Sequence, residues 1–334
     1  MRKKKSLLTI LLFLFGYVAR AQDPIFTQSF FVQETLNPAF SGFEDNGRTH
    51  LGLLHRTQWP NLDLKINTQY FFWNKSIEYG SGQGFGFGLS GLRHHESFTN
   101  YSHHQINANY AHRVNLNGGW YFRPAVEVGA GFKDFRFSSL TLADQININT
   151  GTVSSTSVDP LALNNDNVFF LDISSGIVFE KEEHNGIAYW FGASVKHLNR
   201  PNISFVQGEN LPLDIFYSLH ATYRFPFLND YSIMMTTNYM QQGEYNRLDL
   251  GAMFQVNQFL AAITAVSNPN GSSSNSHLLT SVNAFFGLEY TDFRFGVSYD
   301  FNTSQIGRTN GVYELSVTYL SRCRSCTTQR GRKR

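Results

Sequence analysis

The feature that most constrains the fold of this chain is a two-residue alternation of apolar and polar side chains. Over residues 292–300, Phe, Val and Tyr alternate with Asp, Arg and Ser, and residues 312–319 show the same pattern. Successive side chains of a β-strand point to opposite faces, so this period predicts strands with one apolar and one polar face. About fourteen such segments can be counted, centred near residues 52, 69, 88, 106, 126, 173, 192, 219, 235, 250, 263, 283, 296 and 316.

Long apolar runs are missing from the sequence beyond its first 21 residues. The richest run there is FLAAITAV at 259–266, far short of the roughly 20 residues of a transmembrane helix. Strands of a membrane barrel need only about 9 to 11 residues, of which alternate ones face lipid. The 31 Phe and 16 Tyr residues suit the aromatic girdles of such a barrel. The pattern therefore predicts an all-β protein, an outer-membrane antiparallel β-barrel of about 14 strands.

The connections between the predicted strands support this fold. If both termini are periplasmic, the even-numbered connections face the periplasm and should be short, as NLNGG and YTD are. The long polar connections, at 138–167, 198–213, 268–277 and 302–311, are all odd-numbered. A secreted soluble β-sandwich, the alternative that would extract without detergent, has no reason to sort its loops in this way.

Three residues fit the alternation poorly. Trp190 and Phe285 fall on the polar side of their segments. Pro124 lies inside the fifth segment. Because proline has no backbone N–H to donate to a neighbouring strand, it predicts a bulge or a late strand start there.

The N-terminus has the three parts of a secretory signal peptide. Basic MRKKK precedes an apolar run at 6–18, and Ala19 and Ala21 occupy the small-residue positions before a cut after Ala21. An N-terminal membrane anchor is the weaker alternative, because the apolar run is too short to span a bilayer. Residues 1–21 are therefore predicted to be a signal peptide.

Three parts follow the predicted signal peptide. Residues 22–46 lack alternation and contain two prolines, and we expect an ordered periplasmic arm or a partial plug inside the barrel. The barrel itself is assigned to residues 47–321, and 322–334 to a basic periplasmic tail. Basic residues gather in the signal peptide and tail while the barrel is acidic, so no nucleic-acid partner is expected.

The two cysteines, Cys323 and Cys326, both lie in the tail. Their spacing suits a local disulfide, a redox pair or half of a zinc knuckle, and pairing with a partner protein stays open. Without a second pair or a surrounding βαβ unit, we expect a solvated tail and a barrel that does not depend on disulfides.

Candidate chemistry is sparse. Four histidines, His94, His95, His103 and His104, flank one predicted outward loop and suggest a metal site. Adjacent strand residues point to opposite faces and no cysteine or carboxylate completes a ligand set, so we expect a polar rim and no metal. No G-x-S-x-G elbow, P-loop or H-E-x-x-H motif occurs, and we expect no catalytic residues, no cofactor and no enzyme activity.

Four ordered stretches carry a family resemblance. They are QDPIFTQSFFVQETLNPAFSG with Asn37 and Pro38, LLHRTQWPN with Arg56, Trp59 and Pro60, VKHLNRPNISF with His197, Arg200, Pro201 and Asn202, and the last hairpin from Ser298 to Ser316. Together they resemble the PorP/SprF family of type IX secretion system membrane proteins.

The resemblance implies an outer-membrane barrel of Bacteroidota that serves type IX secretion. It implies a non-enzymatic component that supports export or surface attachment of cargo proteins such as gliding adhesins. The implied partners are the secretion machinery, a secreted cargo protein and the outer-membrane bilayer. The family supplies no catalytic residue, and the motif residues are expected to be structural or to contact a partner. Trp59-Pro60 and Arg200-Pro201-Asn202 stand at predicted loop entries, where they would shape the mouth or simply form turns.

A porin or a transporter of small hydrophobic molecules is the alternative function. Barrels of this size serve many functions, so the fold does not decide between them. Stable open conductance in a planar bilayer would support this alternative.

Overall fold

A computed structural model of the chain describes residues 23–43, 48–79, 82–137, 140–159, 162, 167–183, 186–228, 231–269, 279–303 and 309–321. The predicted signal peptide with Ala19 and Ala21, and the tail with its two cysteines, lie outside the described residues.

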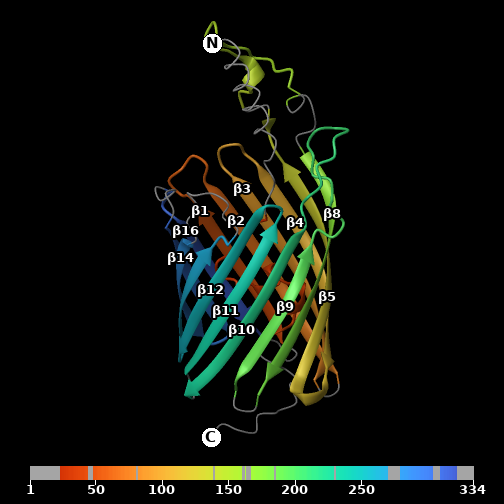
Figure 1. The fold of residues 1–334 in the computed structure, drawn as a ribbon, viewed down its shortest axis with the longest axis vertical. Coiled ribbons are helices and arrows are strands. Elements are labelled where there is room, and N and C mark those ends of the chain that lie inside the picture. The colour runs from red at the N-terminus through yellow and green to blue at the C-terminus, as the bar shows by residue number, and fades with distance from the viewer. Residues whose placement is uncertain are drawn as a thin grey trace.

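The described chain forms a closed barrel of antiparallel strands in sequence order, with β1 paired to β16 (Figure 1). Its fourteen strands are β1 (Thr49–Gln58), β2 (Ile66–Tyr79), β3 (Gln83–Glu96), β4 (Ser102–Asn115), β5 (Trp120–Asp134), β8 (Asn167–Glu182), β9 (Ala188–Lys196), β10 (Phe216–Leu228), β11 (Tyr231–Gln242), β12 (Tyr245–Val256), β13 (Phe259–Ser267), β14 (Leu279–Tyr290), β15 (Phe293–Asn302) and β16 (Val312–Leu320). Each of them covers one of the predicted segments, so the predicted barrel and its strand number are confirmed.

Short elements lie outside the barrel wall. A two-stranded sheet of β6 (Ile146–Asn147) and β7 (Thr152–Val153) follows the 3₁₀ helix η5 (Ala143–Gln145) in the connection between β5 and β8. The 3₁₀ helix η3 (Asn117–Gly119) lies in the β4–β5 turn. None of the helices in the described part of the chain is long or apolar enough to cross a membrane.

The two ends of the barrel differ. One end, here called the long-loop end, carries the connections 135–166, 197–215 and 268–278 and is uppermost in Figure 1. The other, the short-turn end, carries tight connections such as 257–258 and 291–292. The turn at 243–244 is the exception, because it is short and lies at the long-loop end. In outer-membrane barrels the long loops face outward and the short turns face the periplasm.

The wall has an apolar outer face and a mostly polar inner face. Along β2, Thr68, Phe72 and Asn74 are buried, and between them Phe71 is exposed on the outside. Buried Asn, Ser, Thr and charged side chains line the interior along most of the other strands. An apolar face toward lipid and a polar face toward an enclosed interior explain the two-residue alternation.

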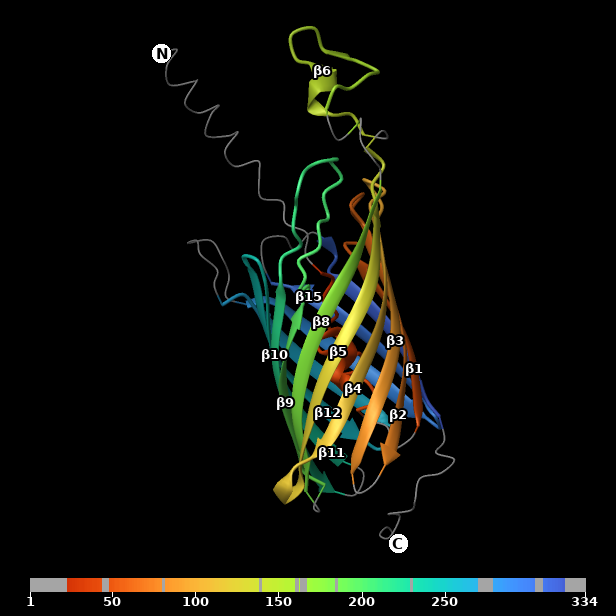
Figure 2. The same ribbon diagram turned by 90° about the vertical axis from the view of Figure 1, so that its right-hand side faces the viewer.

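Residues 23–43 fill the interior of the barrel, and we call this segment the plug (Figure 2). Its two 3₁₀ helices, η1 (Gln33–Thr35) and η2 (Pro38–Phe40), lie among mostly buried residues. The plug begins near His197 at the long-loop end and reaches Gly86 at the short-turn end. Eight strands leave room only for side chains and sixteen leave a channel. A fourteen-stranded barrel therefore has space for such a segment.

The plug explains two of the three residues that broke the alternation. Phe285 makes edge-to-face contacts with plug residues Phe30 and Phe31, at ring-centroid distances of 4.8 and 4.9 Å. Trp190 packs against Phe43 of the plug at 5.4 Å. Both side chains point inward because the plug gives them an apolar surface to cover.

Pro124 does not delay its strand, because β5 begins at Trp120. The ladder to β4 lacks the two pairs at His112 and Arg113, while the register is unchanged on either side of the gap. The predicted late start is therefore wrong, and the missing donor interrupts the pairing locally.

Candidate functional site

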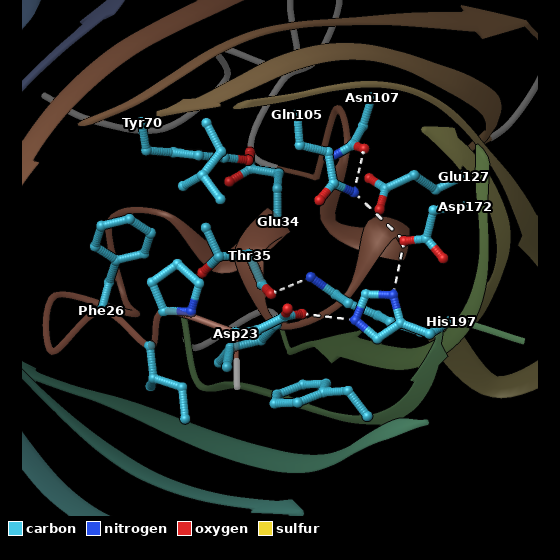
Figure 3. Close-up of a pocket in the computed structure, with 16 residues that line it drawn as sticks. Asp23, Phe26, Glu34, Thr35, Tyr70, Gln105, Asn107, Glu127, Asp172 and His197 are labelled. Carbon is cyan, nitrogen blue, oxygen red and sulfur yellow. Dashed lines mark hydrogen bonds and ion pairs between the residues drawn. The ribbon is translucent and has the colours of Figure 1, made fainter. Parts of the chain in front are cut away.

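A cavity of about 60 Å³ lies between the plug and the inner wall (Figure 3). Its apolar lining comes mainly from the plug and from β2, β3 and β10. Tyr70 contributes a phenol to the lining. The other ionisable lining residues are Asp23, Glu34, Glu127, Asp172, Lys196 and His197. Four carboxylates therefore face one lysine and one histidine in this cavity.

His197 joins the plug to the wall in this cavity. Its Nε2 lies 2.8 Å from Oδ2 of Asp23 at the start of the plug, and its Nδ1 lies 2.8 Å from Oδ2 of Asp172 on β8. The His197 side chain is 2% exposed and that of Asp172 is 3% exposed. Figure 3 shows the imidazole held between the two carboxylates. An imidazolium can donate to both at once, so the arrangement favours the protonated ring.

The surroundings shift the pKa of this histidine. Burial lowers the pKa of His197, but the Asp23 carboxylate, followed by Asp172, outweighs burial and raises it to about 9. Other titratable groups also lie close to these carboxylates, among them Lys196, His103, Lys133, His94, Tyr101 and Glu127. Because the pKa of His197 is raised in the folded state, the contact of its protonated ring with the two carboxylates stabilises the folded protein fully below about pH 6.5, the ordinary pKa of histidine. This stabilisation is lost as the pH rises through about 9.

Glu314 on β16 anchors the middle of the plug. Its carboxylate accepts the backbone N–H groups of Thr27, at 2.9 Å, and Gln28, at 3.1 Å. Arg56 on β1 donates to the same carboxylate at 2.7 Å, and the side chain of Glu314 is 1% exposed. Gln28 also donates to the Glu314 carbonyl and to Ser298, and accepts from Ser316. The plug is thus bonded to β15 and β16, and the Glu314 carboxylate links it to Arg56 on β1.

Asn37 anchors the plug on the opposite wall. Its side-chain amide donates to the carbonyls of Ile177 and Ala193, each at 3.0 Å, and lies 2.9 Å from Nε2 of His220. Its Oδ1 accepts from Ala39 N–H at 2.9 Å and so caps η2, whose first residue is Pro38. Asn37 is fully buried, so these bonds replace water.

The last part of the plug is held by a guanidinium and by close backbone contact. Arg123 on β5 donates to the carbonyls of Ala39 and Ser41, at 3.2 and 3.1 Å. A Cβ at Gly86 would overlap the Ser41 carbonyl, and a Cβ at Gly176 would overlap the Asn37 side chain. Glycine at these two wall positions therefore lets the plug backbone approach closely.

The remaining motif residues form the loop entries. Trp59, with φ +55°, directly follows β1, precedes Pro60, and its N–H bonds the Gly311 carbonyl. Arg200, with φ +44°, turns the chain after β9, and the Pro201 carbonyl accepts Leu213 N–H.

Asn202 completes this second entry. Its Oδ1 accepts from the N–H groups of Ser204 and Leu211, while its Nδ2 donates to the Glu209 carbonyl. The structure therefore divides the predicted site residues into two groups. Asn37 and Pro38 lie in the plug and Arg56 and His197 contact or support it, whereas Trp59, Pro60, Arg200, Pro201 and Asn202 shape two loops.

Two of the four candidate histidines, His94 and His103, are cross-strand partners on β3 and β4, whereas His95 is paired with Ser102 and His104 with Arg93. His94 bonds Thr68, His95 bonds Ser102 and His103 is buried next to Phe170, while His104 alternates with His103 and points outward. In the described part of the chain, no three His, Cys, Asp or Glu side chains are grouped to hold a metal ion.

Sequence reasoning missed the acidic partners of the motif residues. Asp23 lies 174 positions from His197, and Glu314 lies 258 positions from Arg56. Both acids stand in motif stretches, QDP and the last hairpin, but neither pairing could be predicted from neighbouring residues, because only the closed barrel brings the partners together.

An apolar outer wall and a plug bonded to the inner wall define a plugged outer-membrane β-barrel. The model of the family described as type IX secretion system membrane protein PorP/SprF matches residues 18–319. The chain therefore belongs to the PorP/SprF family, as its motifs predicted, and it is an outer-membrane component of type IX secretion.

Three solved structures are similar to this chain, and the first of them shares its fold. A deltaS2S3 mutant of the monoaromatic hydrocarbon channel TodX is 12% identical, with 85% of this chain and 92% of that chain covered and a TM-score of 0.51. The P. putida toluene transporter TodX is 12% identical over 86% and 93%, with a TM-score of 0.45. The KdgM porin is 11% identical over 81% and 98%, with a TM-score of 0.36. A comparison with curated proteins gives no match.

Proposed function

We propose that this protein is a non-enzymatic outer-membrane component that holds a secreted cargo protein, such as a gliding adhesin, for export or attachment at the cell surface. Membership of the PorP/SprF family supports the secretion role. The observation that carries the rest is the plug, because it makes the barrel a closed platform and not a conduit. A role for the motif residues follows: Asn37, Arg56 and His197 keep the lumen closed while the loop ends meet the partner.

The hydrogen bonds that hold the plug in the barrel favour this proposed function over that of a diffusion porin. The plug is held at its start by His197, in its middle by Glu314 and at its end by Arg123. Hydrogen bonds to charged groups each contribute about 1.5 to 3 kcal/mol. Several such contacts in one short segment keep it in place, so the resting barrel offers little path for solutes.

Cargo location tests the proposal. Deleting the gene should leave a type IX cargo protein in the periplasm or shed it into the medium, measured by surface proteolysis and fractionation. Unchanged surface cargo would contradict the proposal.

Conductance measurements test the alternative function, a porin or a transporter of small hydrophobic molecules. The purified protein in a planar bilayer should show little stable conductance, whereas a variant lacking residues 23–43 should conduct. Heat-modifiable migration in SDS gels checks that this variant still folds as a barrel. Stable, solute-selective conductance of the full protein would favour the porin or transporter.

A further inference from the structure

The barrel wall is incomplete between β8 and β9 at the long-loop end. β8 runs from Asn167 to Glu182, but β9 pairs only with Ser175 to Glu182. Above that point the chain leaves the wall at His197, whose φ is +60°. Among the described residues, the upper half of β8 therefore has β5 on one side and no strand on the other (Figure 2).

The connection after β9 covers little of this edge. Leu198 N–H bonds the Ile173 carbonyl, and the Asn199 side chain bonds Ile173 N–H and the Leu171 carbonyl. In antiparallel pairing the N–H and C=O groups of one residue point to the same side of the strand, and every second residue repeats that direction. The N–H and C=O groups of Phe169 and Leu171 therefore point to the same edge as those of Ile173. Within the described residues, no hydrogen bond reaches Leu171 N–H or the N–H and C=O of Phe169 from this side.

The rest of that connection turns inward and leaves the edge open. Ile203 and Leu213 are buried against Phe170, whose side chain points into the barrel. Phe205 continues across to Phe137 at the end of β5, with ring centroids 5.5 Å apart. The connection therefore packs on the inner side of β8 and does not lie beside it as a strand.

The open edge lies at the margin of the lipid-facing band. The outward side chains of β8 run from Phe179 up to Phe169, and ten residues of a tilted strand rise about 25 Å. That height matches the apolar band of an outer-membrane barrel, about 25 Å. Phe169 and Leu171 are 66% and 57% exposed. Unpaired backbone groups are unfavourable next to lipid, so this edge is a place for another strand.

We propose that the edge formed by residues 167–173 of β8 binds an extended segment of the cargo protein, which adds a strand to the barrel wall. The proposal rests on the proposed function. Backbone groups of the cargo segment pair with Phe169 and Leu171, as in other strand additions to an open sheet edge. One face of the segment is apolar and continues the lipid-facing surface beside Phe169, while the other face points toward the barrel interior.

Site-specific cross-linking tests the edge. A photo-reactive residue replaces Leu171 in the full-length protein in native envelopes. The matched control replaces Leu250, which is 52% exposed on β12 and paired on both sides. We expect a cross-link to a secreted cargo protein from position 171 and none from 250. A product of two copies of this chain, or no protein product at 171, would overturn the proposal.

A pair of substitutions isolates the backbone contribution. Phe169→Pro removes the edge N–H, and Phe169→Ala removes the same side chain but keeps that donor. Proline is tolerated at an edge, so both should give heat-modifiable barrels. Losing one hydrogen bond should lower surface cargo about two- to tenfold in the proline variant relative to the alanine variant. Equal amounts of surface cargo in the two variants, together with loss of surface cargo on gene deletion, would refute cargo binding at this edge. The proposed function would then still stand.

Discussion

Replacing Glu314 with glutamine should release the middle of the plug. Glutamine keeps the shape of the side chain and one acceptor oxygen, but it leaves the buried Arg56 guanidinium without its counterion at 2.7 Å. Removing one partner of a buried ion pair costs about 3 to 5 kcal/mol. If that cost falls on docking of the plug, the equilibrium constant for its release rises about 150- to 5,000-fold.

Cysteine labelling measures this release. Ser29→Cys places a thiol on a buried part of the plug, in a background where Cys323 and Cys326 are serine. A membrane-impermeant maleimide should label the Glu314→Gln variant at least about 100-fold faster than the parent.

The matched control makes the same Glu→Gln change at an exposed ion pair. Glu182 bonds Arg224 with side chains 69% and 41% exposed, so Glu182→Gln should leave the labelling rate nearly unchanged. Equal labelling rates of the Glu314→Gln variant and the parent would refute the idea that this carboxylate holds the plug.

Three further predictions concern the other plug contacts. Raising the pH through about 9 should free the start of the plug, seen as greater mobility of a spin label at Pro24→Cys, and His197→Gln should abolish that pH dependence. Asn37→Ala removes bonds to two buried carbonyls and should cost about 2 to 5 kcal/mol, lowering the temperature at which the folded band disappears in SDS gels. Gly86→Ala should push the Ser41 carbonyl away and raise conductance in planar bilayers, and a variant as silent as the parent would contradict this.

The alternation of side chains predicted the barrel because lipid imposes it on every strand. The segments centred near 52 and 316 became β1 and β16, which close the wall. The same reasoning could not place Trp190 or Phe285, because their inward direction depends on a plug whose own sequence has no period. Residues 22–46 were expected to be an arm or a partial plug, and composition alone does not distinguish the two.

The candidate site was partly visible in the sequence. His197 was named from a family motif, but its contact with Asp23 arises only when the chain returns through the lumen. The position at which β9 ends, Lys196, could not be predicted from the sequence either. Polar loop residues follow it directly, and no pattern marks where pairing with β8 stops. Long-range contacts of this kind are set by the closed wall and not by neighbouring residues.

The contact between Thr27 and Glu314 has a consequence for biogenesis. The two residues lie 287 positions apart, and Glu314 belongs to β16, the last strand of the described barrel in chain order. The plug must therefore wait, bound elsewhere or solvated, until the hairpin of β15 and β16 arrives. Joining of the two terminal strands and seating of that segment should then be a single concerted event during membrane insertion.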